Sequence, residues 1–358
     1  MEVRSFAPGR VELLGNHTDY NDGVVLSAAI AFGITAQGSR RDDGEVRLSS
    51  AVSDEAVTFP VSGTAPKSGA WTDYPIGVVH FFREAGFAIE GFEARFTSTL
   101  PIGAGLSSSA ALEVATACLL VKLFDLQIEP MAMAKLCRRA ENEFVGVSCG
   151  LLDQVSSIFG KRDHVVYLDC RAESVERIPF PKNYALLIAD SGVEHALTGG
   201  EYNERRDQCF EAARLLGVPA LRDVNPDQLA AAKIPGYPGR RAAHIVGENS
   251  RVLEAIDCLR DGRVEAFGAL MSASHRSSIE NFENSTPELD LLVEIALATP
   301  GILGSRLTGG GFGGCTVSLV HADHAASAGE HLSKTYQERS GHNTRIFLCE
   351  IGDGALEV

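Results

Sequence analysis

One stretch of the sequence constrains the fold more than any other: a glycine- and serine-rich segment that runs straight into an apolar helix. Residues 101–112 read PIGAGLSSSAAL, and the predicted helix continues to about Phe124. After its serine start, only Glu113, Thr116 and Lys122 in this helix are polar. A helix that is apolar on nearly every side has to be covered all round. We therefore expect it to be buried inside the protein.

The loop before this helix has the chemistry of a phosphate cradle. Its glycines let the backbone approach an anion closely, and Ser107, Ser108 and Ser109 add hydroxyl groups at the helix start. The free N–H groups and the dipole of a helix N-terminus also favour negative charge. The loop is not a Walker A motif, because GxxxxGK[ST] is absent. A serine-capped helix after a tight turn remains the alternative interpretation.

Size and charge favour a small-molecule partner. The chain has 358 residues, which as a soft prior corresponds to two domains. Lysine and arginine number 32 against 47 acidic residues, for a formal charge of −15. Such a chain repels nucleic acid backbones and anionic membranes unless it carries a basic patch, and none is visible, so we expect neither as a partner.

The cysteines and the N-terminus favour the cytoplasm. Eight cysteines are present without a CxxC pair, which is typical of buried free thiols in a reducing compartment. The first residues lack the plan of a signal peptide, and no apolar run approaches the roughly 20 residues needed to cross a bilayer. We expect a monomer or a weak homo-oligomer.

Strands and helices are predicted to mix without regular alternation, which favours an α+β fold. Strands are expected at 24–35, 46–50, 56–59, 91–98, 165–168, 185–190, 316–320 and 344–351. Besides the helix that follows the serine-rich loop and continues to about residue 124, helices are expected at 71–85, 130–144, 202–216, 242–259, 263–276, 287–298 and 322–338. The least structured connection is predicted at 173–183. We therefore predict an N-terminal domain over 1–180 and a C-terminal domain over 181–358, whose last strand is free to return to the first domain.

Three further segments concentrate polar or glycine residues. In the segment 9–20, Asn16, His17 and Asp19 can offer donors and acceptors to vicinal hydroxyls, although a polar turn would look the same. Asp153 follows an apolar pair, which suits either a carboxylate in a dry pocket or a helix N-cap. The glycine run 309–314 contains GxGxxG, but it precedes a strand and does not open a helix, so a close-packed loop against a ligand is the better interpretation.

Together these segments resemble the GHMP sugar and metabolite kinases, and within them the galactokinases. The segment 10–19, the loop 103–111 and the cluster 309–315 occur in family order and spacing, and further resemblance covers 71–74, 141–154 and 201–206. The resemblance implies a two-domain GHMP kinase fold, with an N-terminal mixed α/β domain, a C-terminal domain of antiparallel sheet and helices, and the active site between them. It also implies transfer of the ATP γ-phosphoryl group to the anomeric hydroxyl of D-galactose.

The resemblance assigns roles to individual residues. It implies that Asp153 is the general base and that Arg10 lies beside it, stabilising charge on the phosphoryl group. The sugar-contacting positions are Asn16, His17, Asp19, Gly150 and Tyr202, and the phosphate-binding positions are Gly103, Ala104, Gly105, Leu106, Ser107, Ser108 and Ser109. Ser108, Ser109 and Glu141 are the expected Mg²⁺ ligands. Trp71 and Tyr74 are expected in the adenosine pocket, with core packing as the alternative.

Two departures put the sugar in question. The family pattern has asparagine where this chain has Glu12, and an acidic residue that contacts the sugar where it has Asn16. Kinases for galacturonate, N-acetylgalactosamine or a deoxy-sugar therefore remain alternatives, as does an inactive sugar and ATP sensor. Restoring the carboxylate with Asn16→Glu is expected to leave activity on galactose unchanged or to raise it, unless Glu12 already supplies the acceptor.

Overall fold

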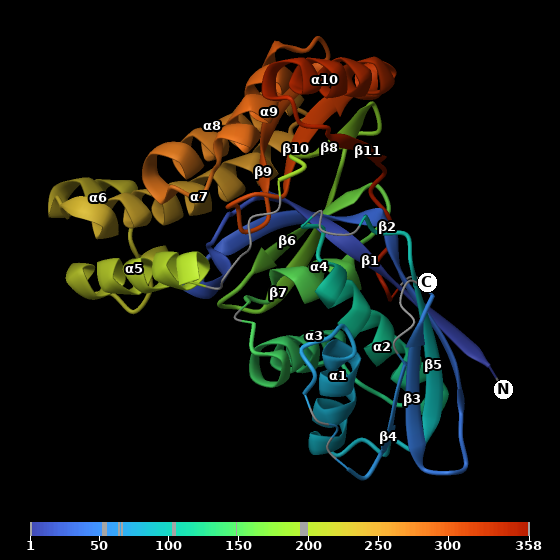
Figure 1. Ribbon diagram of the computed structural model, residues 1–358. Coiled ribbons are helices and arrows are strands. Elements are labelled where there is room, and N and C mark those ends of the chain that lie inside the picture. Colours follow the sequence, from blue (N-terminus) through green and yellow to red (C-terminus); the bar gives the residue numbers. More distant parts are fainter. Residues whose placement is uncertain are drawn as a thin grey trace.

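The computed structural model describes residues 2–51, 56–63, 65, 67–101, 105–147, 149–193 and 200–356. Over these residues, helices are mixed with strands that form one mixed and one antiparallel sheet (Figure 1). The α+β fold predicted from the sequence is confirmed.

The first sheet contains, among the described residues, seven strands in the order β4-β3-β5-β2-β6-β7, with β1 paired to β2. Its strands are β1 (Val3–Leu14), β2 (Val24–Arg40), β3 (Glu45–Ser50), β4 (Ala56–Pro60), β5 (Phe92–Ser98), β6 (His164–Asp169) and β7 (Ser174–Pro179). Strands β3 and β5 are parallel, which makes the sheet mixed. The sequence did not predict β1, because two of its buried residues, Arg10 and Glu12, are charged and line a cavity.

Helix α2 (Ser108–Phe124) is the centre of the N-terminal half. Every residue from Ala110 to Leu120 is buried, as its apolar sequence predicts. It packs against β1 and β2 on one side and against α1 (Asp73–Glu84), α3 (Pro130–Arg139) and α4 (Leu152–Phe159) on the other (Figure 1). The sheet therefore holds the start of α2 in a fixed position.

The helix predicted at 130–144 changes character before its end. The α-helix ends at Arg139, and a π-helical turn, η2 (Ala140–Val145), continues the chain to Gly146, whose φ is 88°. Such turns insert an extra residue, re-aim the side chains and are frequent at functional sites. Here the turn carries Glu141.

The second sheet is antiparallel, in the order β11-β8-β10-β9. Its strands are β8 (Tyr184–Asp190), β9 (Ile302–Thr308), β10 (Cys315–His321) and β11 (Arg345–Cys349). Helices α8 (Val264–Ser277), α9 (Pro287–Ala298) and α10 (Ala325–Ser340) pack on it, and α5 (Gly200–Leu216), α6 (Pro226–Ala232) and α7 (Gly236–Arg260) extend to one side (Figure 1). Strand β9 and helix α6 were not predicted from the sequence.

The connection between the two halves is more ordered than predicted. Strand β7 occupies most of 173–183 because Ile178 is buried against the first sheet, so the prediction of little structure there is wrong. The chain then passes to the second sheet at β8, and the domain boundary at residue 180 stays a prediction. Strand β11 remains in the second sheet, and it is Ile351 that returns to pair with Ile30. None of the described helices is both long and apolar enough to cross a membrane.

Candidate active site

Two adjoining cavities, of about 530 and 410 Å³, lie between the two halves of the protein. Both are lined by Arg10, Asp153, Gly309 and Gly310. The larger cavity contains the serine-rich start of α2, and the smaller one contains the polar residues that follow β1. The cavities therefore meet at the Arg10–Asp153 pair.

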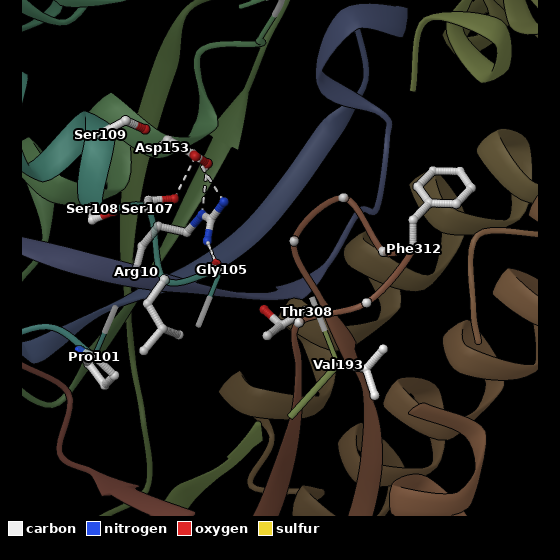
Figure 2. Close-up of a pocket in the computed structure, with 16 residues that line it drawn as sticks. Arg10, Pro101, Gly105, Ser107, Ser108, Ser109, Asp153, Val193, Thr308 and Phe312 are labelled. Atoms are coloured by element: carbon white, nitrogen blue, oxygen red, sulfur yellow. Dashed lines mark hydrogen bonds and ion pairs between the residues drawn. The ribbon is translucent and has the colours of Figure 1, made fainter. Parts of the chain in front are cut away.

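Arg10, on β1, and Asp153, in the first turn of α4, form a partly buried bidentate ion pair. Arg10 Nε donates to Asp153 Oδ1 at 2.7 Å, and Nη2 donates to Oδ2 at 2.8 Å. Arg10 Nη1 also donates to the carbonyl of Gly105 at 3.0 Å (Figure 2). One guanidinium therefore fixes both the carboxylate and the glycine-rich loop.

Ser107 connects the loop to the same carboxylate. Its hydroxyl donates to Asp153 Oδ2 at 2.5 Å, and its φ of 56° lies in the left-handed region, which is uncommon for residues other than glycine. The backbone N–H of Arg10 donates to the carbonyl of Leu106 at 3.2 Å. The structure thus brings Gly105, Leu106 and Ser107 to the Arg10–Asp153 pair, while Gly103 and Ala104 lie outside the described residues.

The smaller cavity gathers the predicted sugar-contacting positions Asn16, His17, Asp19, Gly150 and Tyr202. The position of Asp19 requires a glycine at position 150, because a Cβ atom there would lie 1.7 Å from Asp19 Oδ2. Burial, together with the negative charges of Glu12 and Asp153, raises the pKa of Asp19 to about 7. Asp19 is therefore a buried acceptor that a donor from a ligand would stabilise in its charged form.

His17 is held as a neutral imidazole. Burial lowers its pKa to about 3, against the opposing effect of a hydrogen bond to the backbone at Gly310. Since a carbonyl only accepts, Nε2 carries the proton and donates to the Gly310 carbonyl at 2.9 Å, which leaves Nδ1 to accept from the Tyr20 hydroxyl at 2.9 Å. His17 thus joins the segment after β1 to the glycine run.

The side chain of Asn16 is engaged by the protein itself. Its Nδ2 donates to Glu12 Oε1 at 2.9 Å and to the Gly309 carbonyl at 2.8 Å, and its Oδ1 accepts from Asn284 at 2.9 Å. Asn16 lines the cavity, but both of its amide hydrogens are already bonded.

The glycine run 309–314 connects β9 to β10 and lines both cavities, as expected of a loop packed close to a ligand site. Figure 2 shows it facing the start of α2 across the larger cavity. Four of its glycines have positive φ, between 78° and 130°. It connects two strands and does not open a helix, so its GxGxxG spacing is not that of a Rossmann dinucleotide-binding motif.

Ser108 and Ser109 line both the larger cavity and a third one of about 310 Å³. Trp71, Tyr74 and Phe96 also line this third cavity. The indole Nε1 of Trp71 is buried and has no hydrogen-bond partner among the described residues. Burial also raises the pKa of Tyr74 to about 12. Trp71 and Tyr74 therefore wall a partly apolar cavity that adjoins the serine-rich helix start.

Glu141, on the π-helical turn, is a buried carboxylate that lines the smaller cavity. It accepts hydrogen bonds from the Gln154 amide at 2.8 Å and the Cys149 thiol at 3.1 Å, and it is also bonded to the Ser109 side chain. Burial raises the pKa of Glu141, and the charge of Asp153 adds to this effect. Over the described residues, no group of three or more histidine, cysteine, aspartate or glutamate side chains forms a protein-only metal site.

Several residues that shape the site were not predicted. Glu248 on α7 is fully buried and accepts from the backbone N–H groups of Gly15 and Asn16, at 2.9 and 3.0 Å. Arg306 on β9 donates to Glu12, and Asn284 holds Asn16. These residues lie more than 230 positions from their partners, so no local pattern could have revealed them.

The fold and the site together define a GHMP kinase. The family model of the GHMP kinases N-terminal domain matches residues 73–161, and that of the GHMP kinases C-terminal domain matches residues 255–338. The galactokinase galactose-binding signature matches residues 2–40.

Full-length relatives narrow the family further. Human galactokinase is 43% identical over 366 residues, covering 99% of this chain and 92% of the relative, and galactokinase of Glaesserella parasuis is 40% identical, covering 99% and 94%. The crystal structure of Lactococcus lactis galactokinase complexed with galactose matches with a TM-score of 0.95 at 32% identity, over 99% of this chain and 94% of that one. The chain belongs to the galactokinase family, as the sequence motifs indicated. A mevalonate kinase, at 20% identity and a TM-score of 0.71, shares the fold alone.

Proposed function

We propose that this protein transfers the γ-phosphoryl group of ATP to the anomeric hydroxyl of D-galactose, giving galactose 1-phosphate and ADP. Its membership of the galactokinase family supports both the phosphoryl donor and the sugar. The observation that carries the proposal is the position of the Arg10–Asp153 pair. It lies where the cavity that contains the serine-rich start of α2 meets the cavity that contains the predicted sugar-contacting residues.

In this proposal Asp153 is the general base. Its Oδ2 already accepts from Arg10 and Ser107, whereas Oδ1 accepts from Arg10 alone among the described residues. A carboxylate oxygen has about two lone pairs, so Oδ1 keeps one for a substrate proton. As the anomeric oxygen bonds to the γ-phosphorus, its proton passes to Asp153. The bond from the γ-phosphorus to the bridging oxygen breaks, and ADP leaves.

Arg10 and the loop act on the phosphoryl group. A guanidinium has five N–H donors, and Arg10 uses three of them on Asp153 and Gly105. The others are available to the oxygens of the transferred group, where charge develops. The residues 103–109 are proposed to hold the ATP phosphates at the positive end of the α2 dipole. The cavity around Trp71 and Tyr74 is proposed to take the adenosine.

The proposal includes Mg²⁺, with Glu141, Ser108 and Ser109 as its protein ligands. These residues fit such an ion, because Mg²⁺ prefers oxygen donors and uses one or two carboxylates together with substrate phosphates. Its hydrogen-bond partners among the described residues, Gln154, Cys149 and Ser109, are all uncharged, and its carboxylate is buried beside the serine hydroxyl. Bound there, Mg²⁺ would offset the negative charge of the ATP phosphates.

We further propose that the enzyme works in the cytoplasm as a monomer or weak homo-oligomer. All eight cysteines are free thiols, which suits a reducing compartment. Exposed large apolar side chains such as Phe210, Leu253 and Leu348 lie on three different elements, α5, α7 and β11.

The test is the reaction itself. Purified protein with ATP, MgCl₂ and D-galactose is expected to release ADP only when the sugar is present, and ³¹P NMR should show an anomeric phosphate. Galacturonate, N-acetylgalactosamine and 6-deoxygalactose are the comparison sugars. Faster turnover of any of these, phosphate at another carbon, or binding of both substrates without turnover would contradict the proposal.

A further inference from the structure

Glu12 is a buried carboxylate in the wall of the smaller cavity, which is the one proposed to bind the sugar. It is 4% exposed. Its Oε1 accepts from Arg306 Nη1 at 2.9 Å and from Asn16 Nδ2 at 2.9 Å. Among the described residues its Oε2 has no hydrogen-bond partner, and this oxygen is not shut off from solvent. One oxygen of Glu12 is therefore held by the protein, and the other is open to the cavity.

The residues around Glu12 hold it in a single position. Asn16 is itself fixed by the Gly309 carbonyl and by Asn284, and Arg306 is completely buried with its charge facing Glu12. The guanidinium offsets the charge of the carboxylate, so the open oxygen is a fixed acceptor in a largely desolvated wall. Such an acceptor discriminates strongly for a hydroxyl and against an analogue that lacks it, because it would otherwise stay unpaired.

The spacing along β1 places this acceptor relative to the reacting carbon. Arg10 pairs with Ala29 and Glu12 with Ser27, in a stretch of regular antiparallel register. Two residues along a strand point to the same face and lie about 7 Å apart. This is roughly the length of a pyranose ring with its substituents. With the anomeric hydroxyl at Asp153 beside Arg10, Glu12 lies at the far end of the sugar.

We infer that Glu12 is a specificity-determining residue, whose open oxygen accepts a hydrogen bond from a hexose hydroxyl remote from the reacting carbon, at C4 or C6. Asn16 acts as the positioning residue for Glu12. This inference rests on the proposed function, since it takes the reacting hydroxyl to be at Asp153. The same acceptor, with Asp19 nearby, disfavours sugars that carry a carboxylate.

The test compares D-galactose with its 2-deoxy, 4-deoxy and 6-deoxy analogues in the wild-type protein and in Glu12→Gln. The amide keeps the size of the side chain and an oxygen for Arg306, but it presents a donor where the carboxylate presents an acceptor. For D-galactose we expect kcat/KM to fall about 10- to 100-fold, mostly through KM. For either the 4-deoxy or the 6-deoxy sugar, the two proteins should differ less than threefold, and KM for ATP should not change.

Glu248→Gln is the matched control, because Glu248 is an equally buried carboxylate that holds the backbone of the same segment. It should lower activity on all four sugars by one common factor. Equal losses of kcat/KM on all four sugars in Glu12→Gln would assign Glu12 a structural role and overturn the inference. The inference would also be overturned if the 2-deoxy sugar were the only one on which the two proteins differ little.

Two results remain decisive if Glu12→Gln does not fold. Wild-type protein should use the 4-deoxy or the 6-deoxy sugar at least tenfold less well than galactose, and wild-type use of both at the rate of galactose would overturn the inference. Absence of wild-type phosphorylation of galactose would instead refute the proposed function.

Discussion

Replacing Arg10 with lysine tests the geometry of the ion pair, because charge is kept and shape is lost. Arg10 makes two N–H bonds to Asp153, at 2.7 and 2.8 Å, and a third to the Gly105 carbonyl at 3.0 Å. A lysine ammonium is a point charge without the planar fork, so it can keep one contact to Asp153 but not the other two.

The expected loss follows from those two bonds. A hydrogen bond that involves a charged group contributes about 1.5–3 kcal/mol. Two such bonds, partly replaced by water, amount to about 3–4 kcal/mol of lost transition-state stabilisation. Since about 1.4 kcal/mol corresponds to a tenfold change in rate, kcat should fall about 100- to 1000-fold.

The assay is galactose-dependent ADP release under saturating substrates, with thermal unfolding to confirm that the variant is folded. Arg171→Lys is the matched control, since the Arg171–Asp223 pair is also bidentate but partly exposed, and exposed pairs contribute little. It should keep wild-type turnover. A folded Arg10→Lys variant with kcat within fivefold of wild type would show that the bidentate geometry does not matter for phosphoryl transfer.

Three further expectations follow from the site. Asp153→Asn should lower kcat at least 100-fold, because an amide cannot take up the hydroxyl proton, while isothermal calorimetry should still detect galactose binding. A turnover above about a tenth of the wild-type value would show that Asp153 is not the general base. Because the pKa of Asp19 is raised to about 7, its neutral form predominates below that pH, and KM for galactose should rise as pH falls from about 8 to 6. A wild-type KM that does not change over this pH range would contradict the expectation. Gly150→Ala should raise KM for galactose at least tenfold, because a Cβ would lie 1.7 Å from Asp19 Oδ2, whereas Gly200→Ala, where nothing lies within 4 Å, should not change it. A wild-type KM in Gly150→Ala would show that Asp19 moves away freely.

The sequence predicted the elements whose burial pattern is one-sided or uniform. Helix α2 was found because a run with almost no polar residue has to be covered, and the structure buries it from Ala110 to Leu120. Strand β1 was not predicted, because Arg10 and Glu12 interrupt its apolar pattern in order to line the cavities. The strand that carries the candidate site is thus one that the apolar pattern of the sequence does not reveal.

The same limit applies to the candidate site. Short motifs indicated Arg10, Asp153 and the glycine run because each has a recognisable neighbourhood. Glu248 lies within the long helix α7 with nothing local to distinguish it, and only the folded chain brings it to Gly15 and Asn16. The residues proposed to bind the substrates were therefore visible in the sequence, whereas those that hold them in place required the structure.

The structure reverses one expectation, that Asn16→Glu would leave activity on galactose unchanged or raise it. Asn16 Nδ2 lies 2.9 Å from Glu12 Oε1 and 2.8 Å from the Gly309 carbonyl, so a carboxylate there would replace two donated hydrogen bonds with two repulsive contacts. Two charges about 4 Å apart at an effective dielectric near 20 repel by about 4 kcal/mol, an upper figure before the side chains rearrange. We therefore expect Asn16→Glu to lower both the thermal unfolding midpoint and kcat/KM for galactose. Adding Glu12→Gln to it should recover the unfolding midpoint, because one of the two like charges is removed. If Asn16→Glu alone had wild-type stability and a kcat/KM for galactose equal to or above that of wild type, the pocket would accommodate both carboxylates. Glu12 and Asn16 would then not act as a pair.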